Sequence, residues 1–224
     1  MNSLLLLKLF LAPSVVALVN FTQKRWGHGI GGRLIGLPIT TGPFIFIIYI
    51  QEGGSFASRA AHGILVGQVA LIVFAWVYAN SALRMSWVSA LAVGTFACLL
   101  TGALITSFEI RLPILLPLLA GLWSLAFKFW PKFSMPASDS RAPRWELPAR
   151  LVVTVALILT LTGFASVLGP RVAGALSTYP VIISVLGAFN QRRLGPNSTV
   201  ASLRGLLQIL PLTMVIMTTL TVLL

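Results

Sequence analysis

Eight apolar stretches separated by short polar segments constrain this chain more than any other feature. Each is close to the roughly 20 apolar residues that a helix needs to cross the hydrocarbon core of a membrane. Inside a bilayer, an irregular segment or an open sheet would leave backbone groups unpaired, so we expect every stretch to be helical. The expected spans are 4–22, 34–50, 60–79, 87–107, 112–130, 151–168, 172–190 and 205–224.

The composition supports the same class of protein. Hydrophobic residues make up 57% of the 224 residues and charged residues only 9%, whereas a soluble domain carries about 25% charged residues. We therefore predict an all-α integral membrane protein with about eight transmembrane helices. Residues 4–22 lack the basic segment that opens a signal peptide, so we expect this stretch to be retained as the first helix.

The positive charge of the chain predicts its orientation rather than a nucleic-acid partner. The net charge is +12, and the cations lie between the apolar stretches. Twelve of the 16 lysines and arginines fall in or beside the loops after the first, third, fifth and seventh spans, against four on the other side. Cytoplasmic loops of membrane proteins carry the excess of lysine and arginine. We therefore expect both termini to lie outside; a wrong division of residues 87–130 would reverse the second half.

The scarcity of reactive side chains argues against an enzyme. The chain has four carboxylates, two histidines and the single cysteine Cys98, which lies in an apolar stretch. Neither a zinc-protease nor a serine-hydrolase motif is present, and no thiolate cluster can form. We expect no catalytic residue, no metal and no cofactor.

Two similar stretches suggest an internal repeat. The segments 33–43 and 171–180 both place arginine, glycine and hydroxyl residues in the same order, with Arg33 and Arg171 separated by 138 positions. The repeats would be helices 1–3 and 6–8, inverted in the membrane, with helices 4 and 5 as connectors, a plan known from secondary transporters. The expected parts are a first repeat at 1–80, connecting helices at 81–130, a polar linker at 131–149 and a second repeat at 150–224.

The same two stretches carry a resemblance. The segments RWGHGIGGRLIGLPITTGPFIFIIYIQEGG and LGPRVAGALSTYPVIISVLGAFNQRRLG resemble a group of small bacterial inner-membrane proteins, and the second also resembles the GlpM-type membrane proteins. The resemblance implies a location in the cytoplasmic (inner) membrane of a bacterium. It supplies no catalytic residue and no substrate.

Matched interruptions in the second and seventh spans mark the candidate binding site. Proline inside a helix removes a hydrogen bond and clashes with the preceding turn, and paired Gly/Pro interruptions are a sequence sign of a transporter's binding site. Hydroxyl side chains and freed backbone groups would offer a neutral polar pocket for a small polar or anionic solute. The candidate substrate-binding residues are Pro38, Thr40, Thr41, Gly42, Pro43, Ser177, Thr178, Tyr179 and Pro180. Simple helix kinks repaired by hydroxyl side chains are the structural alternative.

Four ionisable residues are candidates for coupling or gating. Glu52 follows the second span and is expected to pair with Arg59 at the interface, or to act as a coupling carboxylate. His62 is an interfacial polar group or a proton relay. Arg33 and Arg171 contact headgroups or attract an anion.

We therefore expect a small secondary carrier whose partners are the lipid bilayer and a small polar or anionic solute, with a homodimer left open. Two alternatives use the same features. One is a channel or lipid-handling protein built on the same repeat. The other is a scaffold that transports nothing, for which the interface between the interrupted helices would be packed and dry.

Overall fold

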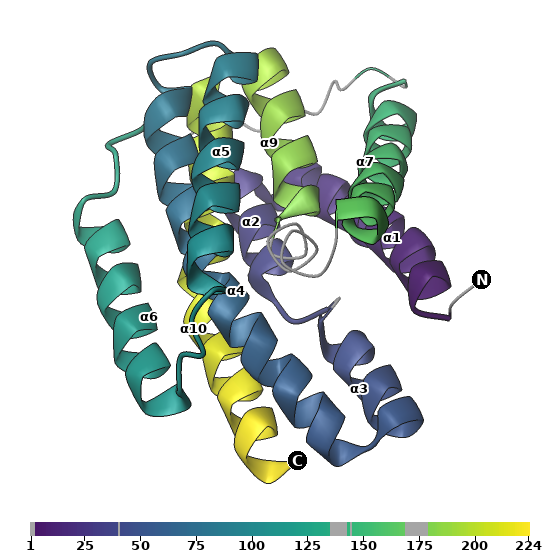
Figure 1. The fold of residues 1–224 in the computed structure, drawn as a ribbon. Helices are drawn as coiled ribbons and strands as arrows, with labels where there is room; N and C mark the ends of the chain where they lie inside the picture. Colours follow the sequence, from purple (N-terminus) through teal and green to yellow (C-terminus); the bar gives the residue numbers. More distant parts are fainter. Residues whose placement is uncertain (1–2, 40, 135–142, 144, 169–178) are drawn as a thin grey trace.

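The protein is an all-helical bundle in the computed structural model, which describes residues 3–39, 41–134, 143, 145–168 and 179–224. The side chains of residues 3–10, 162 and 164–168 are outside that description. No β-strand occurs in the described residues, as the apolar stretches predict. Figure 1 shows the helices running up and down beside one another, with α6 at one edge and α1 and α7 at the other.

Helices occur at each expected span that the structure describes, but several begin earlier than expected: α2 at His28, α4 at Gly54 and α10 at Pro196. The second span is divided into two helices, and the seventh is described only from Tyr179 onward. The elements are α1 (Ser3–Trp26), α2 (His28–Gly36), α3 (Thr41–Glu52), α4 (Gly54–Ala82), α5 (Trp87–Ile105), α6 (Leu112–Lys128), α7 (Glu146–Leu168), α9 (Val181–Leu194) and α10 (Pro196–Leu223).

Several of these helices have the length and apolarity of membrane spans. Four stretches qualify among the described residues: His28–Glu52, which combines α2 and α3, Gly54–Ala82, Trp87–Ile105 and Pro196–Leu223. At 1.5 Å per residue, the 29 residues of α4 exceed the roughly 30 Å of a hydrocarbon core. Large apolar side chains also face outward, among them Phe96 on α5 (69% exposed) and Val215 on α10 (63% exposed). An outward apolar surface of this kind suits lipid rather than water.

The core lies where α4 packs between α5 and α10 (Figure 1). Phe74 and Tyr78 of α4 are fully buried there, together with Leu203 and Leu207 of α10. Gly94 of α5 faces Tyr78, and a Cβ at that glycine would approach the Tyr78 Cβ to 2.9 Å. Small residues therefore let α4 and α5 approach closely, as is usual between membrane helices.

The helices α2 and α10 run parallel with their backbones in contact. Gly29 and Gly36 of α2 face Ala201 and Leu206 of α10, so that both chains advance in the same direction along the interface. A Cβ at Gly36 would come within 2.6 Å of the Leu206 carbonyl oxygen. This interface is the most extensive between any two of the described helices, and it fixes α2 against the C-terminal helix.

Sharp corners at glycine join three pairs of helices. Gly27, Gly53 and Gly195 each have a φ between 82° and 89°, a conformation that L side chains rarely adopt. The corner at Gly27 ends α1 and begins α2, and the corner at Gly195 ends α9 and begins α10. Glycine therefore lets each helix reverse its direction without a loop.

Residues 87–130 form two helices, as expected, because α5 ends at Ile105 and α6 begins at Leu112. The expected linker at 131–149 needs correction at its end. Glu146 opens α7 and its side chain is buried rather than solvated. Arg33, Arg150 and Arg204, which are among the twelve cations counted in or beside the loops, lie inside α2, α7 and α10, and Arg150 is 1% exposed.

Candidate functional site

The second span is interrupted where the sequence predicts it. Helix α2 ends at Gly36 and α3 begins at Thr41, with Pro38 between them. Leu37 has an extended backbone (φ −68°, ψ 149°) because the proline that follows disfavours the helical conformation. The predicted helix break at Pro38 is therefore confirmed.

Only some of the polar groups at this interruption have hydrogen-bond partners among the described residues. The Thr213 hydroxyl of α10 donates to the Gly36 carbonyl oxygen at 2.7 Å, so α10 caps the end of α2. The Gly42 amide donates to the Pro38 carbonyl oxygen at 2.8 Å. The Thr41 Oγ1 is buried and has no hydrogen-bond partner among the described residues. A buried hydroxyl without a partner costs free energy, which marks the start of α3 as a polar position.

In the seventh span, helix α9 begins directly after the other predicted proline. Pro180 is the N-cap of α9, and its carbonyl oxygen accepts hydrogen bonds from the Ser184 amide and the Ser184 hydroxyl. The Tyr179 hydroxyl lies 3.1 Å from Thr95 Oγ1 of α5, and its ring packs edge-on against Phe74. Thus Tyr179 faces the α4–α5 side of the bundle. Other candidates fall outside the described residues: Thr40, Arg171, Ser177 and Thr178.

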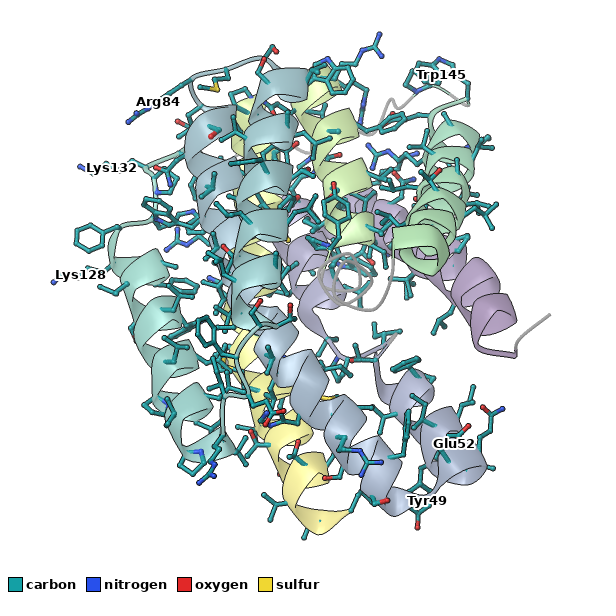
Figure 2. All side chains as sticks on the ribbon, viewed as in Figure 1. Tyr49, Glu52, Arg84, Lys128, Lys132 and Trp145 are labelled. Carbon is teal, nitrogen blue, oxygen red and sulfur yellow. The ribbon has the colours of Figure 1, made fainter. Side chains whose placement is uncertain are left out.

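The remaining predicted residues are spread over the molecule. Glu52 is exposed at the end of α3, far from Arg84, Lys132 and Trp145 at the opposite end (Figure 2).

The expected pairing of Glu52 with Arg59 is wrong. The described residues contain no ion pair between them, and the Arg59 guanidinium lies over the Phe56 ring at 5.6 Å instead. Phe56 lies one turn before Arg59 on the same helix, so the guanidinium can make a cation–π contact with its ring.

The other two ionisable candidates serve helix contacts. The Nε2 of His62 lies 2.9 Å from the Ile110 carbonyl oxygen, which joins α4 to the turn before α6. The Arg33 Nε donates to Gln208 Oε1 of α10 at 2.8 Å. Gly42 and Pro43 lie in the first turn of α3.

A buried polar cluster, which the sequence interpretation did not identify, occupies one end of the bundle. It joins the C-terminal ends of α1 and α9 to the first turns of α2 and α7. All of its members except Arg193 are less than 9% exposed. The cluster comprises Gln23, His28, Glu146, Arg150, Asn190 and Arg193.

The charged half of the cluster has one acid between two cations. The Glu146 carboxylate accepts a hydrogen bond from the Arg150 Nη2 one turn later in α7, and the Arg193 Nε of α9 lies 3.0 Å from Glu146 Oε2. The Arg150 guanidinium also lies over the ring of Phe189, 5.5 Å from its centre. Among the described residues, both cations therefore share one carboxylate, which leaves these three side chains with a net positive charge.

The amide half of the cluster joins α9 to α1, α2 and α10. The Asn190 Oδ1 accepts from Arg150 Nη2 at 2.9 Å, while the Asn190 Nδ2 lies 3.3 Å from Gln23 Oε1 and 3.4 Å from His28 Nδ1. Gln23 Nε2 in turn donates to Ser202 Oγ of α10 at 3.2 Å. A continuous polar chain therefore crosses the bundle from α7 to α10.

A second pair of similar segments in the sequence, at a spacing different from the 138 positions of the expected repeat, could have pointed to this cluster. The segments FTQKRWG (21–27) and FNQRRLG (189–195) share phenylalanine, glutamine, arginine and glycine in register, 168 positions apart. Each ends a helix at one of the positive-φ glycine corners. In both, the polar residues before the corner contribute to the cluster, Gln23 from one and Asn190 with Arg193 from the other.

The fold thus defines the class of protein: all-helical in its described part, with several apolar helices of membrane-spanning length. Comparison of the chain with protein-family models, with curated proteins and with solved structures gave no match. Within the described residues, no group of three or more histidine, cysteine, aspartate or glutamate side chains could hold a metal ion.

Proposed function

We propose that this protein is a secondary carrier for a small polar or anionic solute in the cytoplasmic membrane of a bacterium. The proposal includes about eight transmembrane helices and an inverted relation between helices 1–3 and 6–8. A single observation carries it: the second span is interrupted, and its two halves pack against different helices.

The packing on the two sides of the interruption supports a hinge. Helix α2 packs against α10 and α1, whereas α3 packs chiefly against α4. Between them, Leu37 to Ile39 form a turn without a regular helical hydrogen-bond ladder. Alternating access in transporters is largely a movement of one bundle against another around a fixed site. Because the two halves of the second span pack against different helices, the turn between them could act as the hinge for such a movement.

The polar atoms beside the interruption are hydroxyl groups, which suit a small polar solute that needs no charged partner in the site. Thr41 presents a buried hydroxyl without a partner, and Tyr179 supplies a second hydroxyl at the start of α9. In the proposal, Thr40, Ser177 and Thr178 complete the site. The N-terminus of α3 carries a partial positive charge, which would favour the negative end of a carboxylate or a zwitterion.

Solute counterflow in proteoliposomes tests the proposal. The purified protein would be reconstituted and loaded with unlabelled amino acids, carboxylates or nucleosides, and uptake of the labelled solute would be followed. We expect transient accumulation for one solute class, with at least about a tenfold loss of rate in Thr41→Val because a site hydroxyl is removed. Thr219→Val is the control, since the Thr219 hydroxyl donates only within its own exposed helix face.

Each result has a defined meaning. Equal uptake with and without internal solute would indicate a channel instead of a carrier. Equal counterflow in wild type, Thr41→Val and Thr219→Val would show that the solute does not bind at the interruption of the second span. Absence of counterflow for every solute class, in protein whose unfolding temperature is normal, would contradict the carrier.

A scaffold that transports nothing is the second candidate, and the glycine interface between α2 and α10 favours it. Gly29, Gly32, Gly36 and Gly205 leave no room for a solute between these two helices. A scaffold requires a static α2–α3 turn. Ile39 packs against an apolar cluster of Val15, Val16 and Val19 of α1 and Leu186 of α9. Cross-linking a cysteine at Ile39 to one introduced in this cluster would leave a scaffold intact but stop a carrier.

A further inference from the structure

A small pocket opens beside the buried polar cluster, away from the interruption in the second span. It has a volume of about 10 Å³, which is close to the room that one water molecule needs. Its walls come from α1, α2, α7 and α9. The lining residues are Asn20, Gln23, Lys24, His28, Arg150, Asn190 and Arg193.

The described side chains that line this pocket carry an excess of positive charge. Lys24, Arg150 and Arg193 line it, and among the described residues Glu146 is the carboxylate that contacts the two arginines. Lys24 and Arg193 are half-buried, so the pocket communicates with the surface. Uncompensated charge is costly at a site of low dielectric constant. An anion in the pocket would offset the excess of positive charge.

Arg150 supplies the independent observation that points to a ligand. Its side chain is 1% exposed, yet its Nε and Nη1 atoms have no hydrogen-bond partner within the described part of the chain. Its Nη2 donates to Glu146 and Asn190. A buried guanidinium with unused N–H groups requires an acceptor, because the penalty for leaving such donors unpaired is large.

The first turn of α2 adds to the positive potential. His28 opens this helix and lines the pocket, and the N-cap Gly27 has no side chain that could accept from the first amides. The N-terminus of a helix carries a partial positive charge and favours an anion.

We propose that this pocket binds one compact anionic group, either a free anion of about the size of chloride or a single anionic oxygen of a lipid phosphate. The volume excludes a larger group without rearrangement of the side chains. This site is separate from the proposed transport site, and it stands whether or not the protein is a carrier.

Thermal unfolding in a neutral detergent tests the proposal. The purified protein would be held at constant ionic strength in gluconate, which is too large for the pocket, and titrated with chloride or bromide. We expect a saturable rise in unfolding temperature. Arg193→Gln should raise the half-saturating concentration by about tenfold, since one charged hydrogen-bond donor is lost. Glu146 keeps Arg150 as its partner in this variant.

The adjacent arginine provides a matched control. Arg192 is exposed and lies over the Trp87 ring at 5.8 Å, outside the pocket. Arg192→Gln removes the same charge and should leave the anion response unchanged. A parallel titration with phosphatidylglycerol against phosphatidylcholine distinguishes the two sources: a response to the anionic lipid alone, lost in Arg193→Gln, assigns the group to a lipid headgroup.

The proposal is overturned if neither anion nor anionic lipid has a saturable effect, or if Arg192→Gln and Arg193→Gln change the response equally. Should Arg193→Gln fail to fold, diffraction from wild-type crystals soaked in bromide decides the question. An anomalous peak within contact distance of Arg150 supports the site, and a pocket without a peak contradicts it.

Discussion

Gly205 of α10 lies directly against the carbonyl oxygen of Gly29 in α2, so that the two backbones touch. A Cβ at Gly205 would collide with that oxygen and with the Arg33 amide nitrogen. Close backbone contact between small residues is a major source of helix association in membranes, where lipid is as apolar as the side chains it would replace. The α2–α10 interface therefore depends on glycine rather than on large apolar groups.

We expect Gly205→Ala to destabilise the protein by about 1–3 kcal/mol, because the added methyl group forces the two helices apart. Thermal unfolding in detergent, followed by tryptophan fluorescence, measures the effect. Gly63→Ala on α4 is the control, since a Cβ there meets nothing within 4 Å. An unfolding temperature equal to wild type for Gly205→Ala would show that the backbones do not touch.

Glu146 holds two cations, so its neutralisation should be costly. Glu146→Gln removes the carboxylate that contacts both Arg150 and Arg193, and breaking a buried ion pair costs about 3–5 kcal/mol. Combining it with Arg150→Met should recover part of the loss, because the buried charge is then removed as well. The free energy of unfolding in detergent is the measurement.

Glu109 provides the comparison for that variant. It lies exposed in the turn between α5 and α6, so Glu109→Gln should change the unfolding free energy by less than about 0.5 kcal/mol. If Glu146→Gln proved as mild as Glu109→Gln, the carboxylate would not be the partner of the arginines.

Thr213 should matter more for stability than the exposed Thr219 of the same helix, α10. Its hydroxyl donates across to Gly36, so Thr213→Val leaves the last carbonyl oxygen of α2 without this partner. We expect a loss of about 1–3 kcal/mol. Thr219→Val, in which the lost hydrogen bond lies within α10, should cost less. Equal unfolding temperatures for the two variants would argue against α10 as the cap of α2.

The helices could be predicted from the sequence because each depends on a local pattern. Apolar length predicted where helices occur, and four of the described stretches have the length and apolarity of a membrane span. Pro38 and Pro180 predicted the end of α2 and the start of α9, since proline acts on its own turn. The turn between α5 and α6 was likewise visible from the charges and the proline near residue 111. These features require no knowledge of which helices become neighbours.

The polar cluster could not be predicted in the same way. Glu146 and Arg150 lie beside a polar segment, so their composition indicated a solvated linker rather than a buried pair. Their burial depends on α9 bringing Asn190 and Arg193 against α7, a contact between distant segments. The inverted relation expected from residues 33–43 and 171–180 stays a prediction, because residues 171–178 lie outside the described part of the chain.

The two turns flanking α5 lie at opposite ends of a single membrane-length helix, which allows the orientation to be tested. Ser86 precedes α5 and Ser107 follows it, and both are exposed. In a Cys98→Ala background, Ser107→Cys should react with a membrane-impermeant maleimide added to cells without an outer membrane. Ser86→Cys should react only after the inner membrane is opened, since Arg84 and its neighbouring cations favour the cytoplasmic side. The reverse pattern would invert the orientation, and reaction of both from outside would mean that α5 does not cross the membrane.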